Sequence, residues 1–403
     1  MRVVDPAEFF AHATIQDPYP LYRRLRDEGG VHRVGDSRFH LVSTWEAITE
    51  VVNRPEGFSS NMTATMTYTP ESGVVPFAMD GLGGATHILV TADDPVHAVH
   101  RKLMLGHFTA KRVRNLEPLI AATFDTLWSA GLSGGAIEWM DAVANRLPMM
   151  IVADLIGVPD TDADQLAHWG YASTQLLDGL MSAADLDASM ASIGELNGYI
   201  VTRLRAAAAA PGDDLIGVLA RACAEGTIER LAAQLILVSL FSAGGESTAS
   251  LLGTAVTLLG TDAELQRRLR AEPDLLGAFI EETLRLEPPF RAHYRHVRHD
   301  TDLAGSELPA DSMVLLQWGA ANRDPTHFSS PDELLIDRPG TKGHMSFGKG
   351  LHFCLGAPLA RLEAVTVLTL LLERTTWFDA GDVGPWLPSV LARRRESLLL
   401  NVR

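Results

Sequence analysis

The residue with the clearest chemical signature is Cys354, which lies in the stretch FGKGLHFCLG, Phe347 to Gly356. A thiolate is the metal-binding form of cysteine, and backbone N–H groups near the sulfur stabilise its charge. One thiolate without a nearby cysteine or histidine cluster cannot complete a zinc site, whereas haem brings its own equatorial ligands. The glycines that would let a flat ligand lie close to the backbone are Gly348, Gly350 and Gly356. The pattern favours haem over the alternative, a buried cysteine that acts only as a small hydrophobic residue.

This spacing of phenylalanine, glycines, histidine and cysteine resembles the haem-binding signature of the cytochrome P450 family, and the following GAPLARLE continues the match. The resemblance covers most of the chain, from DPYPLYRRLRDEG (Asp17 to Gly29) through AANRDP (Ala320 to Pro325). It implies the cytochrome P450 fold, mainly α with a small β region, in a single domain of residues 1–403. It also implies haem b (iron protoporphyrin IX), with Cys354 as the axial metal ligand and Phe347 packed near the haem on the sulfur side.

A second motif, AGGEST (Ala243 to Thr248), interrupts the apolar run Leu231 to Leu259. Glycines, an acid and hydroxyls are unfavourable inside a buried helix, so a functional role is favoured over packing. By resemblance, this is the kink of the long helix over the haem, where Ala243 and Gly244 would contact the cofactor. Glu246 would be the acid of the catalytic proton relay, and Ser247 replaces the usual threonine. Because serine lacks the methyl group that restricts rotation, its hydroxyl is less fixed, and Thr248 could share the role.

Several cations stand where the family binds the haem propionates. His97 and Arg101 lie four residues apart on one helix face, after a helix start marked by Asp93, Asp94 and Pro95. By resemblance, Arg295 and His352 complete the set. Taken without the motifs, such side chains are usually exposed to solvent. The resemblance also implies a buried structural network of Glu282 and Arg285 in EETLR with Arg338 in LIDRPG.

The residues expected around the substrate are Met62, Thr63 and Met66 in a lid, Leu240 and Ala243 in the central helix, and Phe290, Arg291 and Arg394. Methionines adapt to irregular apolar ligands, whereas an unpaired buried arginine is costly. The two arginines therefore favour an apolar or aromatic substrate that carries a carboxylate or another acceptor. The alternative is that both point to solvent or pair with acids such as Glu287 and Glu396.

The composition limits the partners. With 34 basic and 50 acidic residues in a chain of 403, the formal net charge is −16, which opposes binding to nucleic acid and to anionic membranes. Two cysteines, with no recognisable signal peptide or membrane anchor, indicate a cytoplasmic protein, and we expect a monomer. By resemblance, the electrons come from a separate ferredoxin and ferredoxin reductase. The basic patch proposed for docking consists of Lys102, Lys111, Arg112 and Lys349.

The function implied is that of a haem-thiolate monooxygenase, which hydroxylates or otherwise oxidises a small organic substrate with O2 and two electrons. Within the enzyme class, the alternatives are a peroxygenase and an enzyme of oxidative coupling or desaturation. Outside it, the alternative is a non-catalytic haem sensor, which the acid and hydroxyls of AGGEST argue against.

These residues require a mainly helical scaffold. Apolar spacing predicts helices from about Pro95 to Leu286, with the alanine run before Pro211 ending one of them. The first hundred residues and the part after Phe290 contain short strand-like runs. The stretch Asn61 to Asp93, which includes GLGGAT (Gly81 to Thr86), lacks steady periodicity and is expected to be a lid loop.

Overall fold

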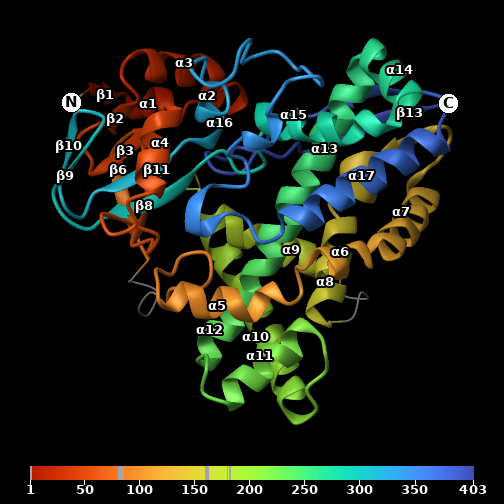
Figure 1. The fold of residues 1–403 in the computed structure, drawn as a ribbon, viewed down its shortest axis with the longest axis horizontal. Coiled ribbons are helices and arrows are strands. Elements are labelled where there is room, and N and C mark those ends of the chain that lie inside the picture. Colours follow the sequence, from red (N-terminus) through yellow and green to blue (C-terminus); the bar gives the residue numbers. More distant parts are fainter. Residues whose placement is uncertain (1, 80–85, 159–162, 179, 181–182) are drawn as a thin grey trace.

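A computed structural model describes residues 2–79, 86–158, 163–178, 180 and 183–403. Figure 1 shows a small β region beside a larger body of helices, with the N-terminus in the β region and the C-terminus on the far side. This is the predicted division between a mainly α body and a minor β part.

The main sheet has six strands in the order β1-β2-β3-β11-β8-β4. Its central strands β3 and β11 are parallel and pair Leu41 with Leu315, while β8 runs antiparallel to β11. Both central strands are buried along their whole length, as expected where a sheet is covered on both faces. The strands are β1 (Arg2–Val4), β2 (Val31–Val34), β3 (Phe39–Val42), β4 (Phe58–Ser59), β8 (His293–Val297) and β11 (Met313–Leu316). The short helices of this region are α1 (Pro6–Phe9), α2 (His12–Gln16), α3 (Tyr19–Asp27), α4 (Trp45–Val52) and α16 (Trp318–Ala321).

Part of the expected lid loop is a β-hairpin, which corrects the sequence prediction. Strands β5 (Ala64–Thr69) and β6 (Gly73–Ala78) pair antiparallel, and Gly73 adopts a positive φ of 65° at the turn. Threonine, tyrosine and valine fit a pleated surface, although no regular alternation signalled the hairpin. Of the GLGGAT stretch, residues 81–85 lie outside the described residues.

Two smaller strand groups complete the β structure. The strands β9 (Thr301–Leu303) and β10 (Ser306–Leu308) form a hairpin. A three-stranded sheet contains β12 (Phe378–Val383), β13 (Leu398–Val402) and β7 (Ala136–Glu138) in that order.

The helices lie where the apolar spacing predicted them. As expected, α10 ends at Ala209, just before Pro211, and the next helix α11 begins after Asp214, whose carboxylate accepts the Gly217 N–H at 2.8 Å. The helices of the larger body are α5 (Val96–Leu105), α6 (Ala110–Arg114), α7 (Glu117–Gly131), α8 (Leu147–Ile156), α9 (Ala163–Gln175), α10 (Ala183–Ala209), α11 (Leu215–Ala224), α12 (Arg230–Leu240), α13 (Ser247–Thr261), α14 (Ala263–Ala271), α15 (Leu276–Leu286) and α17 (Ala357–Arg374). Short π or 3-10 segments are η2 (Met140–Ala144), η4 (Phe241–Glu246), η5 (Pro273–Leu275), η6 (Thr341–Gly343) and η7 (Gly350–His352).

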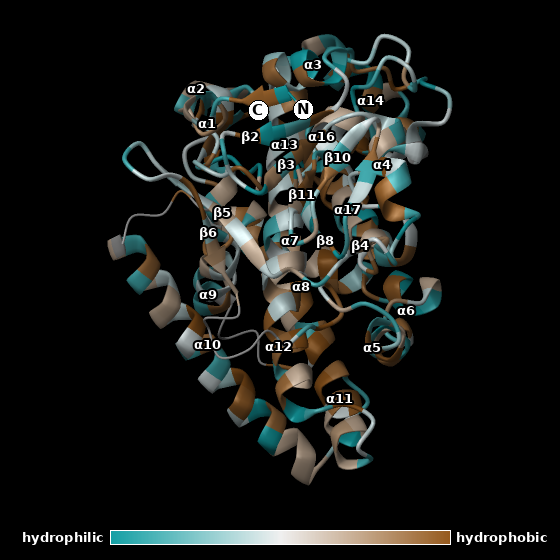
Figure 2. Ribbon diagram, turned by 90° about the vertical axis from the view of Figure 1, so that its left-hand side faces the viewer, coloured by the Kyte–Doolittle hydropathy of each residue, from teal (hydrophilic) through white to brown (hydrophobic). Residues whose placement is uncertain are grey.

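One helical stretch runs through the centre of the molecule. The segments α12, η4 and α13 follow one another without a break, and in the described part of the chain only this stretch, Arg230–Thr261, is long and apolar enough to cross a membrane. However, 61% of its most apolar window is buried inside the protein, as in the core helix of a globular fold. Its α13 part packs against α15 and α17 in the largest apolar cluster, to which α7 also contributes. In Figure 2, apolar residues are also conspicuous on α11 and α12.

Candidate active site

The cysteine loop is shaped by glycine and ends at a helix. Gly348 and Gly350 have φ of 69° and 74°, a left-handed conformation that other residues adopt only with strain. The loop then folds back so that the Cys354 N–H donates to the Phe347 carbonyl at 2.8 Å. The sulfur therefore lies just before α17, where the positive end of the helix dipole favours an anion.

The Cys354 sulfur is surrounded by hydrogen-bond donors and positive charges. Burial raises the pKa of the thiol, but the backbone N–H groups of Gly356 and Ala357 donate to the sulfur and, with the Arg101 and Arg361 guanidiniums, oppose that shift. Hydrogen bonds of this kind are the usual way in which a protein tunes a metal-bound thiolate. The donor set therefore fits the axial ligand of a haem better than an inert core cysteine.

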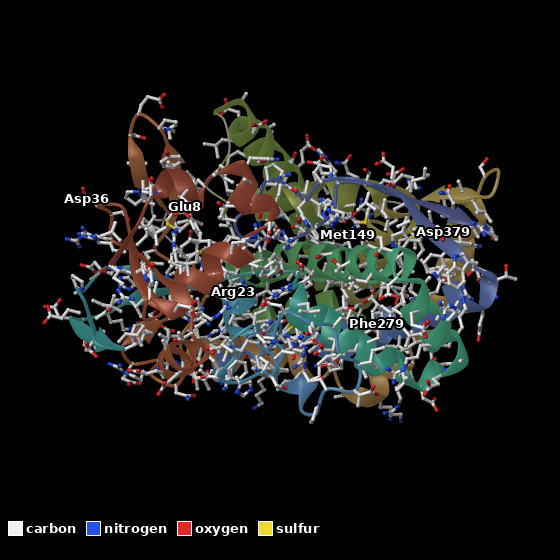
Figure 3. All side chains as sticks on the ribbon, turned by 90° about the horizontal axis from the view of Figure 1, so that it is seen from above. Glu8, Arg23, Asp36, Met149, Phe279 and Asp379 are labelled. Carbon is white, nitrogen blue, oxygen red and sulfur yellow. The ribbon has the colours of Figure 1, made fainter. Side chains whose placement is uncertain are left out.

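In the central helix, the motif AGGEST occupies a π-helical segment followed by the start of α13. A Cβ at Gly245 would overlap the Met149 side chain, and one at Gly244 would lie 2.7 Å from Cγ2 of Val152. Both neighbours belong to α8, and Figure 3 shows Met149 in the interior of the molecule. The two glycines are thus required for close packing of α8 in addition to any space that they leave for a ligand. Single-turn π segments are frequent at functional sites.

The hydroxyls of this motif point in different directions. Ala243 is exposed and Ser247 partly so, and the Ser247 Oγ donates to the Ala243 carbonyl at 2.5 Å. Thr248, in contrast, is only 2% exposed. Ser247 therefore shares the accessible side of the helix with Ala243, and Thr248 faces the core, so the geometry does not support the expectation that Thr248 shares the role of Ser247.

Glu246 lies on the buried side and has an arginine partner. It is 2% exposed, and its Oε1 lies 3.5 Å from Nε of Arg394. Burial raises the pKa of the Glu246 carboxyl, while Arg394 and a hydrogen bond from Thr174 oppose the shift. The Arg394 guanidinium is held in turn over the Tyr171 ring, 4.1 Å from its centroid, and donates to Oδ1 of Asn145 at 3.2 Å. Arg394 thus pairs with Glu246 and not with Glu396, and nothing in this geometry directs it to a substrate.

The role expected of Arg291 also needs correction. Its side chain is 2% exposed and donates to two backbone carbonyls, that of Ile15 at 3.0 Å and that of Ser389. It therefore neither reaches solvent nor pairs with Glu287, whose carboxylate binds Arg393 and Arg323. An arginine committed to the main chain in this way joins distant segments and is not free to bind a substrate anion.

The other expected substrate contacts fall into two apolar clusters. Met66 is fully buried, and its N–H donates to the Tyr294 hydroxyl at 3.2 Å. Met62 packs against the same cluster, whereas Leu240 packs against the cluster around α8 to α12. Thr63 and Phe290 are half-buried; Oγ1 of Thr63 lies 3.4 Å from the Met313 sulfur, and the Phe290 ring lies 5.6 Å from that of His293. Met66 is thus a core residue, and the rest keep partly accessible surface.

The four expected propionate partners come together from three parts of the chain. The rings of His97 and His352 lie 4.2 Å apart, Arg101 donates to the Phe353 carbonyl at 3.0 Å, and Arg295 donates to the Tyr294 carbonyl at 2.7 Å. Burial and the nearby Arg295 guanidinium lower the pKa of His352 to about 3, and burial lowers that of Arg295 to about 10.

This cluster has the charge and the unused donors to accept carboxylates. Nε2 of His97 is buried without a hydrogen-bond partner among the described residues, although its Nδ1 lies 3.3 Å from Asp94. Beside Arg295 and His352 opens a cavity of about 220 Å³, which Lys349 also lines. The acids Glu56, Asp93 and Asp94 line the same cavity, but Arg295 has no ion-pair partner within 4.0 Å among the described residues, and a largely buried guanidinium is costly unless an anion neutralises it. The residues present therefore fit a cofactor with acidic side chains, as haem has.

The buried network expected from EETLR is confirmed. Arg285 donates to both oxygens of Glu282 at 2.7 and 2.9 Å, and Arg338 donates to the same carboxylate at 3.0 Å. Sequence reasoning missed the neighbouring acid Glu281, which binds His344 and Arg361. These partners lower the pKa of Glu281 to about 2 despite its burial. The Arg361 guanidinium lies 4.4 Å from the centroid of the Phe347 ring, so Glu281 supports the cysteine loop through Arg361. The signal in the sequence that could have indicated this role is the position of Glu281 directly before Glu282.

The expected docking patch is only partly continuous. Lys102, Lys111 and Arg112 on α5 and α6 are exposed. Lys349, however, is half-buried, lies 4.9 Å from the centroid of the Trp45 ring and donates to the Thr49 hydroxyl at 3.2 Å.

The known proteins that this chain resembles are cytochromes P450, in agreement with the cysteine loop and the central helix described above. The family model described as Cytochrome P450 matches residues 215–396. Cytochrome P450 144 of Mycobacterium tuberculosis is 59% identical over 399 residues, which cover 99% of this chain and 92% of that protein. Cytochrome P450 monooxygenase PikC of Streptomyces venezuelae is 32% identical over 96% of this chain and 91% of its own length. The crystal structure of CYP109E1 from Bacillus megaterium in complex with testosterone matches with a TM-score of 0.86 at 30% identity, covering 96% of this chain and 98% of that one.

Proposed function

The chain belongs to the cytochrome P450 family, and on this premise we propose that it oxidises a small organic molecule with O2 and two electrons from a separate ferredoxin and its reductase. The proposal is supported by two features that occur together. The sulfur of Cys354 accepts hydrogen bonds from backbone N–H groups, and the central helix presents an accessible serine, Ser247, beside a buried acid, Glu246. A sensor without turnover would not require the second feature.

The family carries a haem-thiolate cofactor, and we propose haem b here. Cys354 would bind its iron, and His97, Arg101, Arg295 and His352 would bind its carboxylates. When bound, the haem supplies the iron centre at which dioxygen is activated. The N–H groups of Gly356 and Ala357 would limit how much charge the Cys354 sulfur donates.

In the proposed proton relay, each residue has a stated task. Burial raises the pKa of the Glu246 carboxyl and Arg394 opposes that shift, so Glu246 is the group of this helix that would take up and release the proton. Ser247, whose Oγ donates to the Ala243 carbonyl, would pass the proton to the accessible side of the helix. We propose that Arg394 is a positioning residue that keeps the Glu246 side chain on the buried side, and not a substrate ligand.

The substrate proposed is an apolar or aromatic molecule. Partly accessible Met62, Leu240 and Phe290 support this, and the testosterone in the CYP109E1 structure is a ligand of this kind. Since Arg291 and Arg394 are both engaged within the protein, a carboxylate on the substrate is not part of the proposal.

The first test is the absorbance spectrum of the dithionite-reduced protein before and after carbon monoxide. A strongly red-shifted Soret band, absent in Cys354→Ser, would support thiolate ligation. An unshifted carbonyl band would contradict it. Turnover is then measured with ferredoxin, its reductase and NAD(P)H, using compounds that change the spin state of the ferric protein.

A peroxygenase is the second candidate, because serine at position 247 holds its hydroxyl less firmly than threonine would. Product formation with hydrogen peroxide that exceeds the ferredoxin-supported rate would favour it.

A further inference from the structure

A second cavity lies away from the catalytic residues, between α10, α11 and the start of α12. Its volume is about 550 Å³, within the range of small-molecule sites. The three helices gather at the lower end of the molecule in both views (Figures 1 and 2). From Arg230 at this cavity to Ala243 at the active site the helix rises for thirteen residues, or about 20 Å. A ligand here would therefore be separate from the substrate.

The lining of this cavity is apolar at the base and charged at the rim. Leu204, Ala220 and Ile228 are buried, whereas Arg205 and Arg230 are exposed. Neither arginine forms an ion pair among the described residues, which distinguishes them from most arginines of the molecule. The exposed acid Glu229 also lines the rim, so the rim carries two positive charges and one negative. An apolar base under a rim with net positive charge suits an amphipathic anion.

The wall of the cavity also carries a thiol. Cys223 is half-buried, and burial raises its pKa while the nearby Arg230 opposes that shift. The helices α12 and α10 are joined beside the cavity, because Gln234 of α12 donates to Asn197 of α10 at 3.0 Å. A pocket with braced helices needs little reorganisation to accept a ligand.

We propose that this cavity is a second binding site, which takes a small apolar molecule with a single carboxylate, such as a medium-chain fatty acid. The chain would lie on the base formed by Leu204, Ala220 and Ile228, and the carboxylate would lie between Arg205 and Arg230. A ligand in this position covers the Cys223 sulfur.

The test uses Cys223 as a reporter in the haem-loaded protein, since the only other cysteine is Cys354. The rate of N-ethylmaleimide labelling of Cys223 is followed by mass spectrometry at increasing decanoate concentration. Decanoate is expected to slow labelling in the wild type. In the double variant Arg205→Ala/Arg230→Ala the half-protecting concentration should rise about fivefold, as for two exposed ion pairs. The matched control Arg203→Ala removes an arginine of the same helix that does not line the cavity and should leave it unchanged.

Two further arms decide between sites and between ligand classes. Ala224→Trp places an indole at the exposed rim and should abolish the protection of Cys223 by decanoate. Any spin-state response of the haem to decanoate should stay unchanged in this variant. Loss of the protection and of the spin-state response together would mean a single, catalytic site and would overturn the proposal. Decanol should protect more weakly than decanoate, and equal protection would refute carboxylate recognition. No protection of Cys223 by decanoate would refute the site itself.

Discussion

Replacing Arg394 with glutamine should remove the charge that faces Glu246 while keeping a polar side chain at this position. At 3.5 Å and an effective dielectric constant of about 20, unit charges attract by roughly 5 kcal/mol. The loss of stability is smaller, because the carboxyl can take up a proton instead. Protonating a group with an ordinary pKa of 4.5 costs about 3.4 kcal/mol at pH 7 and about 0.7 kcal/mol at pH 5. The free energy of unfolding of Arg394→Gln should therefore fall by up to about 3 kcal/mol at pH 7 and by less than about 1 kcal/mol at pH 5.

The sign of this pH dependence follows from the raised pKa of Glu246. Without Arg394, the folded state keeps its proton to a higher pH than the unfolded state does, so stability decreases as the pH rises from 4.5 towards the raised folded pKa. Urea unfolding of the haem-loaded protein at both pH values measures the effect. The double variant Arg394→Gln/Glu246→Gln has no carboxylate at position 246 and should regain most of the loss. An equal penalty at both pH values, with no recovery in the double variant, would refute the assignment of Arg394 as the partner of Glu246.

Three further outcomes are expected. Ser247→Ala should lower the fraction of NAD(P)H that appears as product, whereas Ser247→Thr should keep or raise it; equal product yields in both variants would exclude the serine hydroxyl from the proton relay. Arg112→Glu should weaken ferredoxin-supported turnover but leave peroxide-supported turnover intact, and Lys349→Glu should have a smaller effect because Lys349 is half-buried; unchanged ferredoxin-dependent rates would remove these residues from the docking surface. Arg285→Ala leaves the carboxylate of Glu282 buried with one partner fewer and should cost about 3–5 kcal/mol of stability, measured by urea unfolding; a loss below about 1 kcal/mol would show that the network contributes little.

The features that could be predicted from the sequence have a signal that is local in the chain. The cysteine loop is recognisable because glycines, histidine and cysteine must be close in the chain to surround one sulfur. In the same way, Glu282 and Arg285 are one helical turn apart, so their pairing follows from the helix itself. Helix periodicity and proline positions likewise predicted most of the α-helical body, including the end of α10 before Pro211.

Contacts between residues far apart in the sequence were decided only by the tertiary structure. Arg291 and the Ile15 carbonyl are 276 residues apart, and no local pattern distinguishes an arginine that binds backbone carbonyls from one that binds a substrate. The partner of Glu246 depended in the same way on how the C-terminal segment packs beside α9. The β5–β6 hairpin lacked a regular alternation, because its stability comes from pairing and from packing on the sheet region. Sequence therefore determined which chemical groups the protein has and their local geometry, while long-range packing decided which charges remain available for ligands.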